Sequence, residues 1–528
     1  MEFGALDRLF AETLLKKQGD CPEGGRIALM RLMNHARSGH LCAKREFLGD
    51  GVDLLSPLIV EEGTSLFPKA PVVRYQDLYY LQKNWVYETH LLQLTQKLRR
   101  QAAPAYFNRT FFCEQLEELL NSGKLLSAQA KAIGSVLNQS LSVICGGPGT
   151  GKTYTAAHLV KLLFASRSSD KPDFRVCLAA PTGKAAFHLR SALDAQGVSD
   201  PHLQIESQTL HRHLKLQPGA TRLFSNRKID ADLVIVDEAS MIDVPLLAHL
   251  LEAIGEETSL VLIGDPHQLP PVGSGGLFAE MGHLFGVHLD RCVRTDEPML
   301  QELAGAVKMG ESDRAVQAIA ISSDSLMRPD WPFDGQLTDR IYKYIEPVSL
   351  ELPPDPKLCM EHYNQYRVLN ALRQGPYGSD ALNRDVFSIL QGKNKWWAAP
   401  ILAMVNDPYS DLYNGMSGVL IGKTLKDAIA YFPDPSSEEM RQFSSPPPYE
   451  LAFCLSIHKS QGSEFQHVLA LFPEGSEHFG REALYTAVTR AKKSLKILGS
   501  DTVLQQMLAE HSCTASGFSR RLTQETLS

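Results

Sequence analysis

The chain has 528 residues, which is enough for several domains rather than one core. Its hydrophobic fraction of 44% and charged fraction of 21% are ordinary for a globular protein, and its net charge of −7 excludes a uniformly basic nucleic-acid-binding protein. Any contact with DNA must therefore lie in a local groove or within an assembly.

Membrane and secretory features are also missing from the sequence. No apolar run reaches membrane-spanning length, and no charged-then-apolar leader follows Met1. The nine cysteines include no C-x-x-C pair, which argues against a disulfide framework, a zinc ribbon or an iron–sulfur cluster. We therefore expect a cytoplasmic protein without membrane contact.

Residues 1–97 are expected to form a helix-rich leader. Ala5–Lys16, Arg26–Arg37 and Val86–Leu98 carry apolar residues at helical spacing, and Pro71–Leu81 is typical of a short hairpin. No catalytic constellation occurs there. We interpret residues 1–110 as a docking or regulatory domain.

A phosphate-binding loop dominates the next stretch. After the apolar strand pattern Val143–Cys145, eight residues fit G-x-x-x-x-G-K-[ST], namely Gly146, Gly147, Pro148, Gly149, Thr150, Gly151, Lys152 and Thr153. Glycines let backbone N–H groups curl around a phosphate, and a helix beginning near Lys152 presents its positive end to it. The sequence therefore predicts an ATP site in which Lys152 binds the β- and γ-phosphates and Thr153 holds Mg²⁺.

Gln129 lies just ahead of this loop, in a helix predicted over Leu125–Leu137. Its amide offers a donor and an acceptor, which suits the edge of adenine. On spacing alone, a polar surface residue is an equally good interpretation.

Two further apolar strands end in side chains that suit ATP hydrolysis. Leu233–Val236 runs into Asp237 and Glu238, which are predicted to hold Mg²⁺ and to activate the attacking water, respectively. The strand at Leu260–Ile263 leads to Gln268, which is placed to sense a γ-phosphate. Together with the phosphate-binding loop, these strands predict a parallel core of the RecA-like kind.

Another strand, Arg175–Ala180, ends in a loop at Pro181–Ala186 that offers N–H groups, the Thr182 hydroxyl and a lysine. Open α/β sheets bind ligands at such strand ends, so the loop is suited to a phosphate of nucleotide or nucleic acid, while a plain strand–helix turn fits equally well. Thr209 and His211 form a weaker pattern that a capped helix start explains as well.

A second α/β core is predicted over residues 299–515. Gln365–Asn370, Trp396–Val405, Leu451–Ile457 and Leu495–Ile497 have strand patterns, and Leu484–Ala491 has a helical pattern. Asn406–Pro448, rich in turn residues, suggests a small all-β insertion. Residues 516–528 are expected to be a loose tail.

These motifs, in this order, resemble superfamily 1 DNA helicases, and within them the RecD group. Four stretches carry the closer likeness: Leu369–Gly378, Leu412–Gly415, Ser456–Phe465 and Tyr485–Lys492. His40–Cys42 and Leu78–Leu81 are similar to the amino-terminal domain of RecD, the alpha subunit of RecBCD exonucleases (exodeoxyribonuclease V). The leader lacks repeated helix–hairpin–helix units, which disfavours the stand-alone RecD-like helicases.

The resemblance implies a role for each matching residue. Gln129 would read adenine, Gln268 would couple the γ-phosphate to DNA, Arg490 would be the arginine finger, and Arg294 would be a second γ-phosphate arginine. The DNA path would be lined by Thr182, Thr209, His211, His458 and Ser460. The fold would be two RecA-like P-loop cores in tandem, 111–298 and 299–515, with a helix-rich amino-terminal domain. The insertion at 406–448 would be a small β-barrel over the DNA path, unless it is a structural spacer.

The resemblance also implies a biological role. The chain would be a helicase that moves 5′-to-3′ on single-stranded DNA, at DNA ends, with RecB-like and RecC-like partners in repair and recombination. We find no nuclease metal site, because the carboxylates with a stated role belong to the ATP site. The main alternative is an ATP-dependent DNA-repair switch protein without unwinding activity.

Overall fold

The computed structural model describes residues 3–525, except 17–21, 62–64, 102–103, 105–106, 169–172, 217–226, 272, 274, 293–296, 321–322, 394, 408–409, 411, 435–436, 438 and 512–513. The described part contains two parallel sheets, one antiparallel sheet and a small mixed sheet near the amino terminus. Among the described residues, every helix is too short or too polar to span a bilayer.

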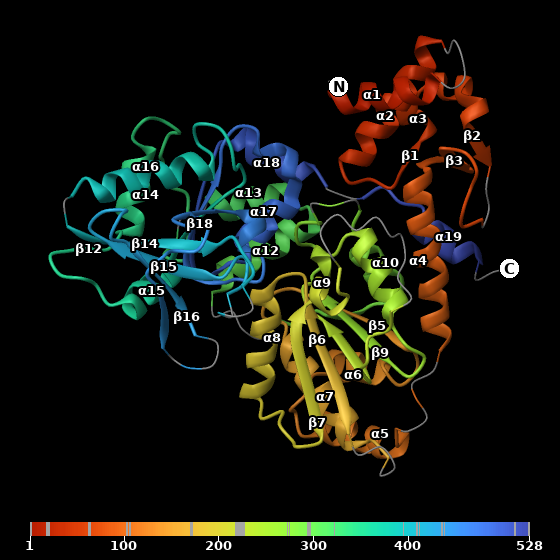
Figure 1. Ribbon diagram of the computed structural model, residues 1–528, viewed down its shortest axis with the longest axis horizontal. Helices are drawn as coiled ribbons and strands as arrows, with labels where there is room; N and C mark the ends of the chain where they lie inside the picture. The colour runs from red at the N-terminus through yellow and green to blue at the C-terminus, as the bar shows by residue number, and fades with distance from the viewer. Residues whose placement is uncertain are drawn as a thin grey trace.

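The amino-terminal part combines helices with a four-stranded sheet of order β1-β4-β3-β2 (Figure 1). Its elements are α1 (Ala5–Leu15), α2 (Glu23–Arg37), β1 (Cys42–Lys44), α3 (Arg45–Leu48), the 3-10 helix η1 (Asp50–Leu58), β2 (Ile59–Glu61), β3 (Val72–Tyr75), β4 (Leu78–Leu81) and α4 (Gln82–Arg100). The predicted helices and the β3–β4 hairpin are confirmed.

The first core is a six-stranded, all-parallel sheet of order β10-β5-β9-β8-β6-β7. Its elements are α5 (Arg109–Asn121), α6 (Ser127–Ser135), β5 (Leu141–Gly146), α7 (Lys152–Ala165), β6 (Phe174–Ala180), α8 (Gly183–Ala195), β7 (Leu203–Thr209), α9 (Leu210–His213), β8 (Leu233–Val236), η2 (Ala239–Met241), α10 (Val244–Ala253), β9 (Ser259–Gly264), α11 (Phe278–Phe285) and β10 (Val287–Leu289). The strands are buried on both faces, which is why they read as continuous apolar runs.

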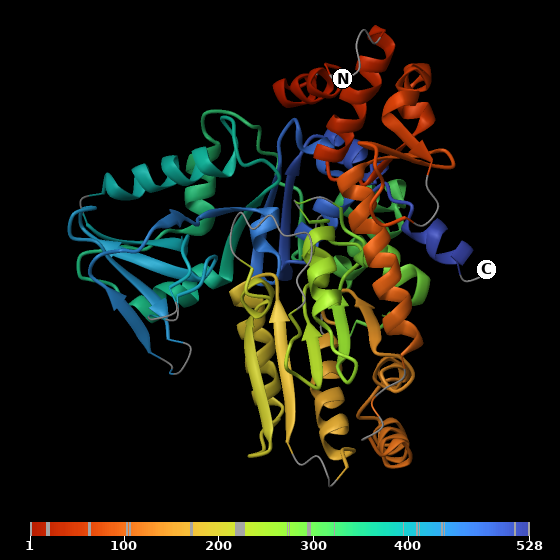
Figure 2. The ribbon, with the colours of Figure 1, turned by 45° about the vertical axis from the view of Figure 1, so that its right-hand side comes forward.

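Alternate residues of these strands face two different hydrophobic clusters. On one face Ile144 and Ile235 pack with α5, α6, α7 and α8. On the other, Val143 and Val234 pack with α10 and α11, and also with α4 from the amino-terminal part. The helix α4 therefore covers the first core as well as its own sheet, as Figure 2 shows.

The second core is a five-stranded, all-parallel sheet of order β11-β21-β20-β13-β19. Its elements are α12 (Pro298–Met309), α13 (Ser312–Ala320), β11 (Leu326–Met327), α14 (Leu337–Ile345), α15 (Pro356–Gln365), β13 (Tyr366–Asn370), α16 (Ser379–Gln391), β19 (Cys454–Ser456), η3 (Ile457–Ser460), β20 (Phe465–Phe472), η4 (Ser476–Phe479), α17 (Gly480–Val488), β21 (Ala491–Gly499) and α18 (Asp501–Ala509). Two parallel α/β cores are thus present, one after the other along the chain.

The antiparallel sheet has the order β12-β14-β15-β16-β17, with β18 paired to β14. Its strands are β12 (Ser349–Leu350), β14 (Trp396–Ala403), β15 (Ser417–Gly422), β16 (Ile429–Pro433), β17 (Met440–Phe443) and β18 (Tyr449–Leu451). Two predictions are corrected here. The strand predicted at 396–405 belongs to this sheet rather than to the parallel one, and the single strand predicted at 451–457 is two strands, in different sheets, separated by Ala452 and Phe453. A closed barrel stays a prediction.

The prediction of a loose tail beyond Ala515 is wrong. The helix α19 (Phe518–Glu525) packs on α4, and Phe518 and Arg521 are buried. Arg521 donates to Glu88 Oε1 at 3.1 Å and to Thr89 Oγ1 at 2.7 Å. The guanidinium also lies 3.8 Å from the centre of the Trp85 ring. The sequence gives no local sign of this packing because both partners of the ion pair look like ordinary surface residues.

Removing Arg521 should destabilise this junction strongly. Arg521→Met leaves the Glu88 carboxylate buried without its cation, so we expect the free energy of unfolding to fall by about 3–5 kcal/mol in denaturant titrations. Arg520→Met is the matched control, because Arg520 pairs with Asp77 at the surface and should contribute less than about 1 kcal/mol. Equal effects of the two variants would contradict a buried, stabilising pair.

Candidate functional site

The phosphate-binding loop connects β5 to α7, and its geometry depends on glycine. Gly149 and Gly151 have φ values of 75° and 83°, in the left-handed region that favours glycine. A Cβ on Gly146 would lie 2.5 Å from Thr150 Oγ1, so the turn has no room for a side chain there. Lys152 begins α7 and donates to the carbonyls of Gly146 and Gly147 at 2.9 and 3.0 Å, which holds its ammonium over the loop.

Gln129 is buried, which rules out the surface interpretation. Its Oε1 accepts from Leu126 N at 3.0 Å, and its Nε2 lies 3.4 Å from the carbonyl oxygen of Thr150 in the loop. The residue therefore joins α6 to the phosphate-binding loop. Its contact with adenine stays a prediction.

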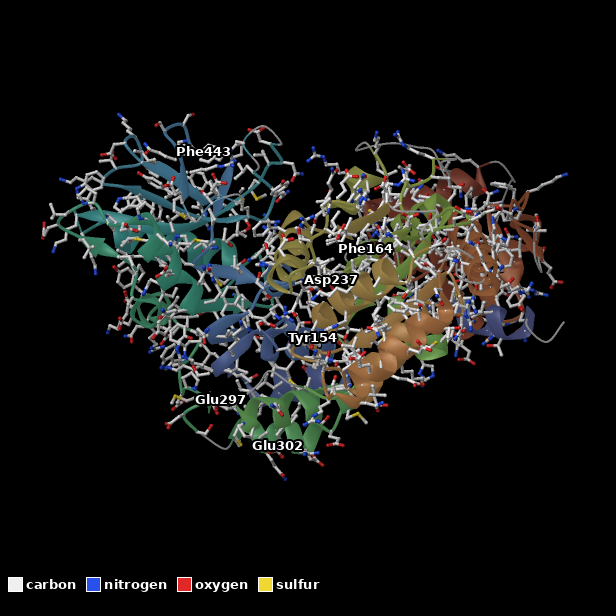
Figure 3. All side chains as sticks on the ribbon, turned by 90° about the horizontal axis from the view of Figure 1, so that it is seen from below. Tyr154, Phe164, Asp237, Glu297, Glu302 and Phe443 are labelled. Carbon is white, nitrogen blue, oxygen red and sulfur yellow. The ribbon has the colours of Figure 1, made fainter. Side chains whose placement is uncertain are left out.

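Asp237 and Glu238 follow β8 at the carboxyl edge of the same sheet. Asp237 Oδ1 accepts from Glu238 N at 2.8 Å, and Glu238 has a φ of 52°, a strained conformation typical of functional sites. Burial raises the pKa of Asp237, and the Lys152 charge opposes that rise. Figure 3 shows Asp237 near the middle of the molecule, between the two cores, whereas Phe443 lies at the outer side of the antiparallel sheet.

Glu238 is set up to exchange a proton near neutral pH. Burial and then the Asp237 charge raise the pKa of Glu238 to about 7, while Arg490 and Lys152 oppose this. Because a general base must be deprotonated, we expect kcat/KM for ATP hydrolysis to fall about tenfold per pH unit below about 7. ATP itself also titrates near this pH. Nucleotide binding by Glu238→Gln, measured across the same pH range, reports the ionisation of ATP without that of Glu238. A kcat/KM that does not change with pH in the wild-type chain would contradict the role of Glu238 as the base.

Residues of the second core contact this site directly. Gln461 Nε2 donates to Leu269 O at 3.2 Å, and Leu269 N donates to Thr486 Oγ1 at 3.1 Å. Lys184 Nζ donates to Ser463 Oγ at 2.8 Å, and burial lowers the pKa of Lys184 to about 8. The two cores therefore meet through hydrogen bonds made by the predicted motifs.

Arg490 is buried in the second core, just after α17. Its guanidinium donates to Thr486 O at 3.2 Å, Ser463 O at 3.1 Å and Thr489 Oγ1 at 3.3 Å. Its charge opposes the rise in the pKa of Glu238. Arg490 therefore lies within electrostatic reach of Glu238, and its role as the arginine finger stays a prediction.

The residues predicted to line the DNA path are placed differently from one another. Thr182 caps α8, where Oγ1 accepts from Ala185 N at 3.3 Å, and Thr209 and His211 lie at the end of β7 and in α9. His458 is partly exposed in η3. Ser460, in contrast, has no exposed surface and donates to Ile457 O at 2.7 Å, so its hydroxyl is not accessible to DNA in this structure. Arg294 lies outside the described residues.

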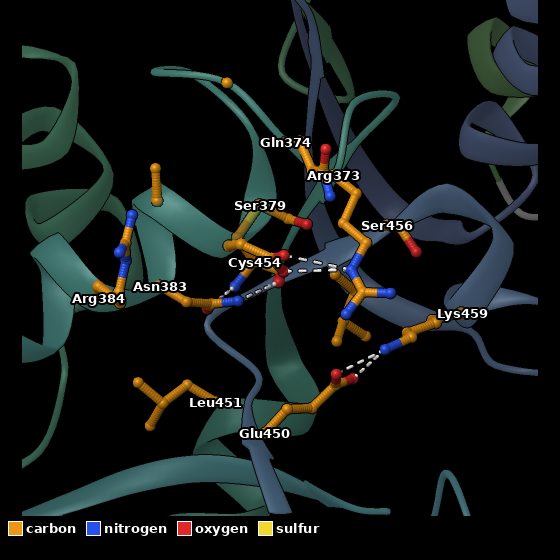
Figure 4. Close-up of a pocket in the computed structure, with 14 residues that line it drawn as sticks. Arg373, Gln374, Ser379, Asn383, Arg384, Glu450, Leu451, Cys454, Ser456 and Lys459 are labelled. Carbon is orange, nitrogen blue, oxygen red and sulfur yellow. Dashed lines mark hydrogen bonds and ion pairs between the residues drawn. The ribbon is translucent and has the colours of Figure 1, made fainter. Parts of the chain in front are cut away.

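A polar cavity of about 500 Å³ lies at the carboxyl ends of β13 and β19. Figure 4 shows Arg373, from the segment after β13, and Lys459, from η3, reaching into it. Arg373 Nε lies 3.2 Å from Asp380 Oδ2, and Lys459 Nζ lies 2.6 Å from Glu450 Oε2. Sequence reasoning missed this pocket. Arg373 and Lys459 were inside the quoted motifs, but their convergence depends on the fold.

Mg²⁺ fits the donor set at the ATP site. The Thr153 hydroxyl and the Asp237 carboxylate supply hard oxygen ligands, which Mg²⁺ prefers, and these residues follow β5 and β8 at the same sheet edge. Elsewhere, the described residues include no group of three or more His, Cys, Asp or Glu side chains suited to a metal. The absence of a nuclease site stays a prediction.

Comparison with known proteins gives consistent results. Residues 129–274 match the AAA domain family, and residues 451–498 match the UvrD-like helicase C-terminal domain. The RecBCD enzyme subunit RecD of Mycobacterium tuberculosis is 31% identical over 559 aligned residues, covering 97% of this chain and 93% of the relative. The ATP-dependent RecD2 DNA helicase of Deinococcus radiodurans is 26% identical, covering 72% of this chain and 50% of that protein.

Solved structures give a weaker match. A crystal structure of a Pif1 helicase from Bacteroides in complex with ADP-AlF3 and single-stranded DNA covers 76% of this chain and 97% of its own, at 16% identity and a TM-score of 0.43. We draw no residue-level argument from a likeness of that size.

Proposed function

Because the chain belongs to the RecD family and is an ATP-hydrolysing DNA helicase, we propose that it serves as the RecD-like motor of a RecBCD-type assembly, moving 5′-to-3′ on single-stranded DNA from DNA ends. The observation that carries this is the junction of the two cores at the ATP site. Gln461 and Thr486 of the second core bond to Leu269, and Ser463 bonds to Lys184. A Cβ on Gly462, in the same second-core loop, would lie 3.7 Å from Glu238 Oε1.

Different residues of the chain have different roles in ATP hydrolysis. Lys152 and the loop N–H groups bind the phosphates, and Gln129 contacts adenine. Glu238 removes a proton from the attacking water, and Gln268 orients that water. Arg490 exchanges one of its second-core acceptors for the γ-phosphate and stabilises the charge of the transition state. Thr153 and Asp237 would hold Mg²⁺, which would supply positive charge to offset that of the phosphates.

The DNA path follows the partly exposed residues of both cores. Thr182, Thr209 and His211 contribute from the first core and His458 from the second. A Cβ on Gly183 would lie 2.7 Å from Tyr413 Cβ, so the loop beside the antiparallel sheet packs next to Thr182. We infer that this sheet lies over the path. Arg373 and Lys459 add phosphate contacts at the second-core cavity, which bind without reading sequence.

Movement follows from the position of ATP between the cores. Binding brings Arg490 toward Lys152 and closes the junction, and hydrolysis lets it open. If each core holds the strand with different strength in the two states, the cycle moves the chain along DNA. The amino-terminal domain is the surface that docks on the RecB-like and RecC-like partners, in the cytoplasm.

Strand displacement tests this proposal. Duplexes with a 5′ or a 3′ single-stranded tail are mixed with the chain, alone and with its partners, and Lys152→Gln serves as the inactive control. We expect ATP-dependent displacement of the 5′-tailed substrate only. Displacement of only the 3′-tailed duplex would refute the polarity, and ATP hydrolysis without displacement of either would indicate a non-unwinding switch.

A further inference from the structure

Tyr485 connects the second core to the phosphate-binding site, and the mechanism above gives it no role. It lies in α17 and is 5% exposed. Its hydroxyl donates across the core junction to Asp265 Oδ2, at 3.0 Å. A Cβ on Gly147 would lie 3.0 Å from the same hydroxyl, so the hydroxyl also packs against the phosphate-binding loop. One hydroxyl thus contacts two separate parts of the ATP site.

Asp265, which accepts from Tyr485, also accepts a hydrogen bond from Gln268. Asp265 is 1% exposed, its Oδ1 accepts from His267 N at 3.0 Å, and Gln268 Nε2 lies 3.3 Å from its Oδ2. A carboxylate only accepts hydrogen bonds, so the amide nitrogen of Gln268 must face it and the amide oxygen must face away. Gln268 Oε1 is buried and has no hydrogen-bond partner within the described residues. An unpaired, buried amide oxygen is costly, which suggests a ligand for it.

Tyr485 and Arg490 are held in the same segment of the second core. Arg490 donates to Thr486 O and to Thr489 Oγ1, so its guanidinium is bound to the end of the helix that carries Tyr485. Any motion of the second core that brings Arg490 to the nucleotide therefore also moves the tyrosine hydroxyl. The same motion reaches Asp265 through a hydrogen bond.

We propose that Tyr485 is a positioning residue for ATP hydrolysis. Its hydroxyl orients Asp265, and Asp265 in turn holds Gln268 with its oxygen directed at the attacking water. This series of hydrogen bonds, from Tyr485 through Asp265 to Gln268, is called the relay below, and it rests on the proposed role of Gln268 at the γ-phosphate. Gln268 is then oriented correctly only when the second core, which carries Arg490, is in place. Water is therefore activated only in the closed state.

Tyr485→Phe removes the hydroxyl alone. We expect kcat for ATP hydrolysis to fall about tenfold, with KM for ATP changed by less than about twofold, because the lost hydrogen bond acts on orientation and not on nucleotide binding. Tyr363→Phe is the matched control. Its hydroxyl is also buried in the second core and donates to Ala398 O at 2.6 Å, far from the relay. The control should leave kcat unchanged.

A double-mutant cycle identifies the route. If Tyr485 acts through Gln268, Tyr485→Phe should cause no further loss of kcat in a Gln268→Ala background. Losses that multiply, or an unchanged kcat in Tyr485→Phe, would overturn the proposal. Should Tyr485→Phe fold poorly by circular dichroism, Asp265→Asn takes its place in the same cycle under the same criterion.

The relay and the motor fail in different ways. The cycle is judged on the rate of hydrolysis in the full chain, with or without DNA. Wild-type chain that hydrolyses ATP but never displaces a strand would refute the proposed motor, whereas losses of kcat that multiply in the cycle would refute only the relay.

Discussion

Arg490→Ala should lower kcat for ATP hydrolysis by about a thousandfold or more while ATP binding persists. An arginine finger acts on charge that develops in the transition state, so its removal affects turnover much more than affinity. In the structure its three hydrogen-bond acceptors all belong to the second core, and its charge acts on Glu238 in the first. Single-turnover hydrolysis and nucleotide titration measure the two effects separately.

Two variants control for stability and for charge. Arg481→Ala alters the first turn of α17, the helix that precedes Arg490, where Arg481 lies beside Glu482, and it should keep normal turnover. Arg490→Lys retains the charge but not the fork of donors, so it should recover only part of the rate. Full activity in Arg490→Ala would mean that the second core does not complete the ATP site.

Lys152→Gln should reduce hydrolysis by about a hundredfold to a thousandfold, because it removes a fixed charge that faces the phosphates. Lys152 is a partly buried residue that begins α7 and donates to two loop carbonyls. Glutamine can still donate to one of these carbonyls, so the loop and the fold should persist, as circular dichroism will show.

Lys161→Gln is the control for Lys152→Gln. Lys161 lies on the same helix, and its exposed ammonium contacts Gln196 O. It should hydrolyse ATP at the normal rate. If Lys152→Gln also turned over normally, the assignment of the phosphate-binding loop would be wrong.

The local parts of the site were predictable from sequence. The phosphate-binding loop and the Asp237–Glu238 pair each lie within a few residues of an apolar strand, so periodicity and residue type locate them. The order of the parallel strands then brings their ends to one edge. Gln129 could be placed only in part, since burial decided between its two interpretations.

The long-range contacts were not predictable. Tyr485 and Asp265 are 220 residues apart, and Arg521 and Glu88 are 433 residues apart, so no local sequence pattern predicts either pair. The prediction of one short strand was wrong for a related reason. Leu451–Leu455 is continuously apolar, but Leu451 pairs with the antiparallel sheet and Cys454 and Leu455 pair with the parallel one, a choice that depends on partners elsewhere in the chain.

The most direct test of a DNA motor is ATP hydrolysis by the purified chain with and without a single-stranded oligonucleotide. We expect the single strand to stimulate hydrolysis strongly, either in the chain alone or once RecB-like and RecC-like partners are added. Arg490→Ala should lose that stimulated rate. Hydrolysis that stays the same with DNA in both settings would contradict a DNA motor.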